Sequence, residues 1–380
     1  MLAKQIIIRK PAELASKLAT LQIADPGLLL VFGSVQQITF PGLAETLRSS
    51  YPNALQLGCS TAGEISPDGV DDGTCTITAL RFDKTRLTPA STQLTGMEDS
   101  FGAGERLGRQ LAGPGLKAVL VFGPGVQING SALVNGMTSI IGSEVPITGG
   151  LAGDGGAFKQ TFTLGQEGVS GHHVVAVGLY GERLRFGHGS FGGWEPFGPA
   201  RKVTHCEGNV LYELDGEPAL EIYKRYLGEH AQGLPASGLL FPFAMLGEDH
   251  NAIGLIRTIL GVDEATGSLT LAGEINVNGY LKLMHASTDK LVNGAEAAAE
   301  AAAEMTPVAS ENLAILVSCV GRKLVMGNRV DEEVEAVGDV LGKSALLTGF
   351  YSYGEISPFT PGAACKLHNQ TMTITCLGEA

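Results

Sequence analysis

The chain carries little positive charge, and its basic residues are nowhere clustered. Its 380 residues include 26 Lys and Arg against 39 Asp and Glu, which gives a formal net charge of −13 at pH 7. Nucleic acids and anionic membrane surfaces attract proteins through gathered Lys and Arg side chains. The charge pattern therefore argues against both classes of partner.

Long apolar runs and paired cysteines are also lacking. No run approaches the roughly 18 apolar residues that a membrane-spanning helix needs. The N-terminal MLAKQIIIRKPAE turns basic after three isoleucines, unlike a signal peptide. Six cysteines occur without a CxxC pair or a zinc-like spacing. We expect reduced thiols, a cytoplasmic location, no membrane insertion and no metal site.

Glycine, by contrast, is abundant at 53 residues, and three apolar runs are typical of buried central strands. The runs are GLLLVFG (27–33), KAVLVFG (117–123) and LAILVSCVG (313–321). Each is followed by a helical stretch and then by a Gly-rich strand end, at GCSTAGE, TGGLAGD and TGFYSYGE. Similar distances separate run and glycine: Leu28 to Gly58, Ala118 to Gly149, and Ala314 to Gly349. This spacing predicts strand–helix–strand units.

Two phrases recur near both ends of the chain in the same order. GEISP stands at 63–67 and 354–358, followed by TCTITAL (74–80) and TMTITCL (371–377). Threonine alternating with apolar residues predicts half-buried strands. An internal duplication explains the matched order better than coincidence does. We predict an α/β fold, with α+β as the alternative, in which two related domains of mixed β-sheet carry flanking helices.

The length of the chain favours two domains. GHGSFGGWEPFGP (187–199) is rich in Gly, Pro and aromatic residues, as expected of a crossing between domains. We predict domains at 1–190 and 203–380, joined by a crossing at 191–202. EGNVLYELDGEPALEIYKRYLGEH then predicts a strand, a turn and a helix, and NGAEAAAEAAAEMTP (293–307) predicts a helix bounded by Asn293 and Pro307.

Several of these segments resemble the FIST family, named for F-box and intracellular signal transduction proteins. GCSTAGEI resembles the signature of its N-terminal domain. EGNVLYELDGEPALEIY, SCVGRK, GFYSYGEISP and HNQT resemble signatures of its C-terminal domain. The resemblance implies a standalone bacterial-type sensor of small molecules such as amino acids. It also implies an alternative, because some members are described as haem-binding nitric-oxide sensors that pair with histidine kinases.

The repeated phrase places Glu64 and Glu355 at the ends of predicted parallel strands, where open α/β sheets bind ligands. One interpretation has both carboxylates facing a shared cleft that holds a cationic or amino group. The other has each carboxylate accepting backbone N–H groups in its own turn. Tyr351 and Tyr353 are expected to wall a pocket, where the first copy of the phrase offers the hydroxyl of Ser60.

Three further side chains have two interpretations each. Arg322 either binds a ligand carboxylate bidentately or pairs with Glu355. Cys319 is either a reactive thiol or a small buried hydrophobe, and Asp154 is a ligand or a turn residue. The ligand-binding prediction comprises Ser60, Thr61, Gly63, Glu64, Asp154, Cys319, Arg322, Tyr351, Tyr353, Gly354 and Glu355.

The sequence supports a catalytic function and haem binding less well than it supports small-molecule binding. GCSTA has Ala62 where a G-x-S-x-G nucleophile elbow needs glycine, which argues against Ser60 as a nucleophile. His188 and His368 are the candidate axial ligands under the haem alternative. No other cofactor is predicted.

We therefore expect a cytoplasmic, non-catalytic sensor that binds a small molecule between Gly-rich loops of the related domains. A partner, such as a histidine kinase or another signalling protein, would read the bound state. The alternatives are a haem-based nitric-oxide sensor and an enzyme acting on a small metabolite.

Overall fold

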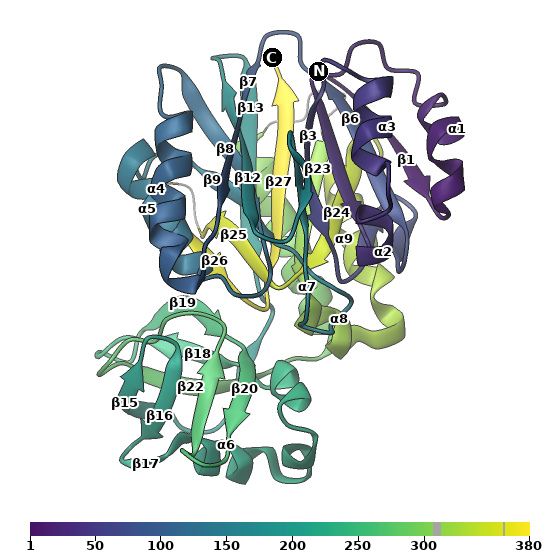
Figure 1. The fold of residues 1–380 in the computed structure, drawn as a ribbon. Coiled ribbons are helices and arrows are strands. Elements are labelled where there is room, and N and C mark those ends of the chain that lie inside the picture. Colours follow the sequence, from purple (N-terminus) through teal and green to yellow (C-terminus); the bar gives the residue numbers. More distant parts are fainter. Residues whose placement is uncertain (307–312, 360–361) are drawn as a thin grey trace.

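The computed structural model describes residues 1–306, 313–359 and 362–380. These residues form three six-stranded sheets of like topology and one nine-stranded sheet. Figure 1 shows the three sheets together in the upper body, with both termini at its top, and the fourth sheet in a lobe beneath. The predicted α/β class and the repeated strand–helix–strand units are confirmed.

The first sheet is built mainly from the first unit, residues 2–81. Its order is β1-β6-β2-β3-β10-β11, and its β2–β3 pair is parallel. The strands are β1 (Leu2–Ile8), β2 (Leu28–Gly33), β3 (Leu55–Ser60), β6 (Cys75–Arg81), β10 (Thr163–Gly165) and β11 (Gly168–Ser170). The helices of this unit are η1 (Pro11–Glu13), α1 (Leu14–Leu18), α2 (Val35–Ile38) and α3 (Leu43–Ser50).

The second sheet repeats this plan with the second unit, residues 86–180. Its order is β7-β12-β8-β9-β25-β26, and β8–β9 is again parallel. The strands are β7 (Arg86–Gln93), β8 (Leu116–Gly123), β9 (Ile147–Leu151), β12 (His173–Tyr180), β25 (Gly354–Pro358) and β26 (Cys365–His368). The helices are η2 (Met97–Asp99), α4 (Ser100–Leu111) and α5 (Gly130–Ile141).

The third sheet repeats the plan once more with the third unit, residues 184–191 and 288–379. Its order is β13-β27-β23-β24-β4-β5, with β23–β24 parallel. The strands are β4 (Glu64–Ser66), β5 (Gly69–Asp71), β13 (Leu184–Phe191), β23 (Leu313–Cys319), β24 (Leu346–Ser352) and β27 (Met372–Glu379). The helices are α7 (Thr288–Met305), α8 (Val320–Met326), η5 (Gly327–Arg329) and α9 (Asp331–Leu341).

Each unit lends a hairpin to a neighbouring sheet. The hairpin β4–β5 pairs with β24, β10–β11 pairs with β3, and β25–β26 pairs with β9. The two GEISP phrases therefore begin exchanged hairpins at equivalent positions. This exchange also brings the loops of different units together at the carboxyl ends of the parallel strands.

The nine-stranded sheet belongs to an inserted segment, residues 195–285, within the third unit. Its order is β19-β18-β22-β15-β16-β21-β20, with β14 beside β22 and β17 beside β16. The predicted strand, turn and helix here are confirmed. The elements are β14 (Glu195–Pro196), β15 (Arg201–Glu207), β16 (Val210–Leu214), β17 (Glu217–Pro218), α6 (Ala219–Leu227), η3 (Gly228–Gly233), η4 (Ala236–Leu240), β18 (Phe243–Leu246), β19 (Ala252–Arg257), β20 (Ile259–Asp263), β21 (Ser268–Leu271) and β22 (Tyr280–His285).

Two sequence predictions differ from the structure in detail. Residues 187–191 of the expected crossing form the end of β13, which pairs with β27 along its whole length. The helix expected from Asn293 begins earlier, at Thr288, because the Ser287 side chain accepts a hydrogen bond from the backbone N–H of Lys290. Pro307 lies outside the described residues. The predicted crossing at 191–202 and the domains on either side of it stay predictions.

A central core joins the three sheets. Phe32 of β2, Phe122 of β8 and Phe350 of β24 meet there with ring centroids 4.8–5.7 Å apart. Each side chain is fully buried. This aromatic contact fixes how the three sheets sit around the ends of their parallel strands.

The glycines whose spacing repeats in the sequence have one structural role. A Cβ on Gly58, Gly149 or Gly349 would lie 1.9 Å from a carbonyl oxygen of the parallel neighbour strand. Only glycine allows this approach. The repeated distance in the sequence thus marks the position in each parallel pair at which the neighbouring backbone leaves no room for a side chain.

Candidate functional site

A polar cleft of about 530 Å³ opens at the carboxyl ends of the parallel strands, between loops of all three units. Open α/β sheets bind ligands at this edge. The first unit contributes loops after β2, β3 and β5, the second unit the loop after β9, and the third unit α8 and the start of η5. Its polar and charged lining residues are Ser34, Gln36, Thr61, Glu64, Asp72, Asp154 and Lys323.

Glu64, the first residue of β4, lies in the wall of the polar cleft with 2 % of its surface exposed. Its Oε2 accepts hydrogen bonds from the backbone N–H and the hydroxyl of Thr74, both at 2.8 Å, and its Oε1 accepts one from the Thr61 hydroxyl. Burial raises the pKa of this carboxyl to about 7 despite these bonds. Glu64 therefore titrates near neutral pH.

Glu355 has an equivalent set of hydrogen bonds in the third unit. Its Oε1 accepts from the Ser352 hydroxyl at 2.6 Å, and its Oε2 from the hydroxyl and backbone N–H of Thr371 at 2.9 and 3.2 Å. Burial raises its pKa to about 7 as well. Glu355 is fully buried and is not among the residues that line the polar cleft. Each glutamate thus anchors its own turn, and the structure does not bring the two into one shared cleft.

Asp154 places a fixed negative charge in the polar cleft. Its carboxylate accepts hydrogen bonds from the backbone N–H groups of Phe158, Lys159 and Gln160 at 2.7–2.9 Å, and from the Tyr353 hydroxyl. Burial alone would raise the pKa of this carboxyl, but the hydrogen bonds outweigh burial and lower the pKa. Asp154 is therefore ionised at neutral pH.

Lys323 is the basic residue that lines the polar cleft, and sequence analysis missed it. Its Nζ donates to the carbonyl oxygen of Ala62 at 2.9 Å and to the Asp72 carboxylate. The same Nζ lies 5.4 Å from the centre of the Tyr351 ring. The ammonium is therefore already neutralised by a protein carboxylate.

Gly63 allows this lysine to reach across the cleft. Its φ is +140°, and a Cβ there would lie 2.5 Å from the Lys323 Nζ and 3.1 Å from the Tyr351 ring. Any side chain at this position would push Lys323 away from Ala62. Gly63, predicted as a ligand-binding residue, lines the polar cleft and lets the Lys323 amine approach the backbone closely.

Arg322 is fully buried, does not line the polar cleft and pairs with Glu333, which corrects the predicted pairing with Glu355. Its Nη2 lies 2.7 Å from Oε2 of Glu333 in α9, and neither side chain is exposed. The Arg322 guanidinium also donates to the carbonyl oxygens of Gly192 and Leu291. Arg322 precedes Lys323 on the short helix α8, so the two side chains leave the helix in different directions.

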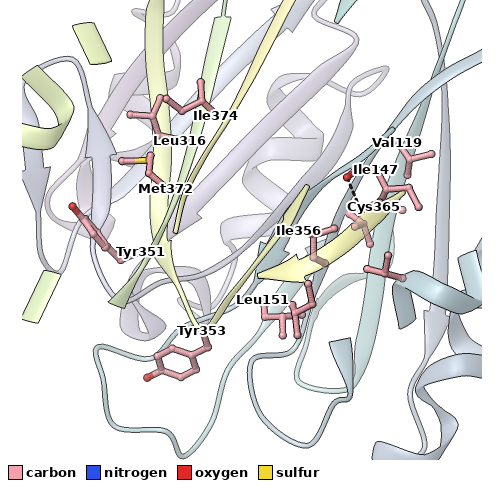
Figure 2. Close-up of a cluster of buried hydrophobic side chains, with 14 of the residues drawn as sticks. Val119, Ile147, Leu151, Leu316, Tyr351, Tyr353, Ile356, Cys365, Met372 and Ile374 are labelled. Carbon is pink, nitrogen blue, oxygen red and sulfur yellow. Dashed lines mark hydrogen bonds between the residues drawn. The ribbon is translucent and has the colours of Figure 1, made fainter. Parts of the chain in front are cut away.

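The two tyrosines of the C-terminal phrase have separate surroundings. Tyr351 is fully buried, and its hydroxyl donates to Oε1 of Glu333 at 2.5 Å. Figure 2 shows the Tyr353 ring apart from Tyr351, on the side of Leu151. The Tyr353 hydroxyl donates to Asp154, and its ring stacks on Phe158 with centroids 4.0 Å apart. Tyr353 therefore walls a pocket, as predicted, whereas Tyr351 lies beneath the polar cleft.

The pocket beside Tyr353 is a second, apolar cavity of about 280 Å³. One wall comes from the second unit, including Ile128, Leu151 and Phe158, and the opposite wall comes from the inserted sheet, including Leu260 and Leu271. The loop 154–158 thus borders the polar cleft at one end and this cavity at the other. That loop connects the two spaces.

The remaining predicted ligand residues, Ser60, Cys319 and Gly354, do not line the polar cleft. Ser60 is buried, with its Oγ donating to the Gly153 carbonyl at 2.7 Å and accepting from the backbone N–H of Phe162 at 2.9 Å. Cys319 is buried, and burial raises the pKa of its thiol, which fits a small hydrophobe rather than a nucleophile. Gly354 begins β25 and pairs with Leu151.

The residues proposed as haem ligands do not fit that group. His188 and His368 lie inside β-sheets with 3 % and 1 % exposure, and neither lines the polar cleft or the apolar cavity. The His368 Nε2 is 2.9 Å from the carbonyl oxygen of Ser357, and burial lowers the pKa of its imidazole to about 4.

Two further properties bear on function. Over residues 1–306, 313–359 and 362–380, no three His, Cys, Asp or Glu side chains are grouped to hold a metal ion. Within the same ranges, no helix has the length and apolarity that crossing a membrane requires.

Two of the curated proteins to which this chain is similar are uncharacterized proteins from an archaeon and a bacterium. One, from Methanocaldococcus jannaschii, is 36 % identical over 99 residues, which are 24 % of this chain and 18 % of that protein. The other, from Mycobacterium tuberculosis strain H37Rv, is 29 % identical over 199 residues, which are 49 % of this chain and 50 % of that protein. The matched part thus spans half or less of each relative.

Among solved structures, a cyanuric acid hydrolase from A. caulinodans aligns with 100 % of this chain and 99 % of its own, at a TM-score of 0.38 and 9 % identity. The family comparison is more specific. A family model of the FIST N domain matches residues 27–217, and one of the FIST C domain matches residues 219–358. The chain belongs to the FIST family, whose domains are signal-transduction sensor domains.

Proposed function

We propose that this protein is a cytoplasmic, non-catalytic sensor that binds a small molecule with an amino or other cationic group in the polar cleft. The observation that carries the proposal is the charge of the lining. The lining has three acidic residues, Glu64, Asp72 and Asp154, and one basic residue, Lys323, which is already paired with Asp72. A cationic ligand would supply the positive charge that the cleft lacks.

The dimensions of the cleft suit a metabolite. Its volume of about 530 Å³ lies within the usual range for small-molecule sites. Thr61, Ser34 and Gln36 add hydroxyl and amide groups for the polar part of a ligand. A free amino acid or a small amine fits this combination.

The loop 154–158 offers a route from the cleft to the rest of the molecule. A ligand that draws on the Asp154 carboxylate competes with the hydrogen bonds from Tyr353 and Phe158. Both of these residues line the apolar cavity against the inserted sheet. We suggest that a partner, such as a histidine kinase or another signalling protein, reads the change on that side.

A thermal-shift screen tests the proposal, because a ligand that binds the folded state raises the melting temperature. The panel comprises free amino acids, small mono- and diamines, and quaternary ammonium compounds, with dicarboxylates as the opposite charge class. We expect amines to raise Tm and Glu64→Gln and Asp154→Asn to weaken their affinity about tenfold, or ~1.4 kcal/mol.

Asp68→Asn is the matched control, because Asp68 is an exposed acid of the same hairpin that does not line the cleft. It should leave the shift unchanged. The proposal fails if no amine stabilises the wild type, or if both cleft variants bind the amine as the wild type does.

A further inference from the structure

A buried guanidinium without a carboxylate partner lies at the contact between the inserted sheet and the body. Arg257, the last residue of β19, is 3 % exposed. Its hydrogen bonds go to the backbone carbonyls of Glu274 at 3.1 Å, Ile256 at 3.2 Å and Leu367 at 3.5 Å. Over the described residues, no Asp or Glu oxygen lies within 4.0 Å of it, in contrast to Arg322.

Burying such a cation costs free energy, because it loses its solvation by water and no carboxylate is present to compensate. Burial lowers the pKa of Arg257 to about 10, so the group still carries its charge at neutral pH. Its Nη2 makes no hydrogen bond to any described residue, and this nitrogen is the one with donors to spare. Partial negative charge on backbone carbonyls compensates the cation only in part.

A cavity of about 130 Å³ adjoins this guanidinium. Arg257 contributes to it from the inserted sheet, Lys366 from β26 of the second sheet, and Ser131 from the first turn of α5. A second cation and a helix N-terminus both favour a negative ligand. Asn135 and Asn276 add amide groups at the exposed edge.

One acid faces the same cavity. The Glu274 carboxylate is exposed and accepts a hydrogen bond from the Asn129 side chain at 3.3 Å, and it lies too far from Arg257 to form an ion pair. With Arg257 and Lys366 opposed by Glu274, the lining keeps an excess of positive charge. The net charge of this lining is thus opposite in sign to that of the polar cleft.

The shape beneath the guanidinium is also specific. A Cβ on Gly273, whose φ is +138°, would lie 2.9 Å from Nε and 3.0 Å from Cζ of Arg257. The guanidinium can lie flat against this glycine only because no side chain is there. The guanidinium of Arg257 is thus held in one orientation, in which the N–H groups of Nη2 can donate charge-assisted hydrogen bonds to an oxyanion.

We propose that this cavity binds a small oxyanion, either inorganic phosphate or the carboxylate of a small acid, on the guanidinium of Arg257. The bound oxyanion would link the inserted sheet to β26 and α5 and hold the lobe against the body. The site is separate from the polar cleft and takes a ligand of the opposite charge, so it stands or falls independently of the proposed function.

The test uses the full chain titrated with phosphate or acetate against chloride at fixed pH and ionic strength. Melting temperature is measured for both anions, and ³¹P line broadening is measured for phosphate. We expect at least one oxyanion to raise Tm above the chloride reference. Stabilisation by phosphate alone identifies a phosphate site, and stabilisation by acetate identifies a carboxylate site.

Arg257→Gln should lower the affinity at least tenfold. Arg225→Gln removes an equal charge from an exposed ion pair on α6 of the same lobe and should bind as the wild type does. If Arg257→Gln does not fold, Lys366→Gln replaces it, with a several-fold weaker affinity expected. The proposal is overturned if neither anion exceeds chloride in the wild type, or if the folded variant keeps the wild-type affinity.

Discussion

Glu64 and Glu355 occupy equivalent positions in two units and have equivalent hydrogen-bond partners. Each is buried, each accepts a hydroxyl from the residue three positions before it, and each accepts the hydroxyl and backbone N–H of a threonine that opens the next long strand. Of these two glutamates, Glu64 lines the polar cleft and Glu355 does not. A repeated structural anchor has therefore become available for binding in one copy.

The raised pKa of Glu64 predicts a specific pH dependence of stability. Between its ordinary pKa of 4.5 and its folded value of about 7, the folded protein holds a proton that the unfolded chain has lost. The free energy of unfolding should therefore fall as pH rises through this window, by on the order of 3 kcal/mol for this group. Denaturant unfolding between pH 4.5 and 8 should show a smaller decline in Glu64→Gln than in wild type. An unchanged slope would contradict the assignment.

The Arg322–Glu333 pair predicts a second effect. Removing one charge leaves the other buried without a partner, so Glu333→Gln should destabilise the protein by roughly 3–5 kcal/mol. Replacing both residues, as Arg322→Met with Glu333→Leu, should restore part of this loss because no charge remains buried. The recovery is incomplete because the Tyr351 hydroxyl and the carbonyl oxygens of Gly192 and Leu291 lose their hydrogen-bond partners. Urea unfolding of the three proteins measures both values. A double variant less stable than the single one would argue against this explanation.

At the scale of elements, the apolar runs and Gly-rich strand ends were sufficient to predict the three strand–helix–strand units. Their hydrophobic patterns depend on local burial, which a sequence displays directly. The exchange of hairpins was not predictable in this way, because it pairs β4 with β24 across nearly the whole chain. The inserted segment 195–285 further separates β13 from the rest of its sheet, so the sequence does not indicate that β13 belongs to the third unit.

The equivalent glycines of these pairs predict a sharp steric effect. In Gly58→Ala and Gly349→Ala the new methyl group would meet a backbone carbonyl oxygen at 1.9 Å, and backbone cannot move aside cheaply. We expect a loss of about 3 kcal/mol or more in either variant. Gly113→Ala, with no atom within 4 Å of the new Cβ, should change stability by less than about 0.5 kcal/mol. If Gly113→Ala lowered the free energy of unfolding as much as the other two variants, the proposed steric role of Gly58 and Gly349 would be refuted.

The loop 154–158 predicts a local change in dynamics. The Tyr353 hydroxyl accepts hydrogen bonds from the backbone N–H groups of Asp154, Gly156 and Phe158. Tyr353→Phe removes that acceptor, so these amides should exchange with solvent faster by about tenfold, while amides of β2 should keep their protection. Hydrogen-exchange mass spectrometry measures both segments. Unchanged exchange in the loop would mean that Tyr353 does not hold it.

At the scale of the whole molecule, the candidate site exists only where three units meet. Thr61, Gly63, Glu64 and Asp154 were predicted because they lie at the Gly-rich strand ends GCSTAGE and TGGLAGD. Lys323 and Asp72 were missed, since their contact joins a helix of the third unit to a loop of the first. SCVGRK contains the lysine, but the apolar run LAILVSCVG predicts a strand that continues to Gly321. In the structure a helix begins directly after Cys319, and on this helix the side chains of Arg322 and Lys323 point in different directions.

The central claim is that the polar cleft binds a cation beside Glu64, and proton release tests it most directly. Isothermal titration calorimetry at pH 6.5, in two buffers of different ionisation enthalpy, counts the protons released when the most stabilising amine binds. We predict release of most of one proton, an affinity that rises with pH through about 7, and loss of both effects in Glu64→Gln. Binding without proton release, or with the same release in Glu64→Gln, would contradict the account.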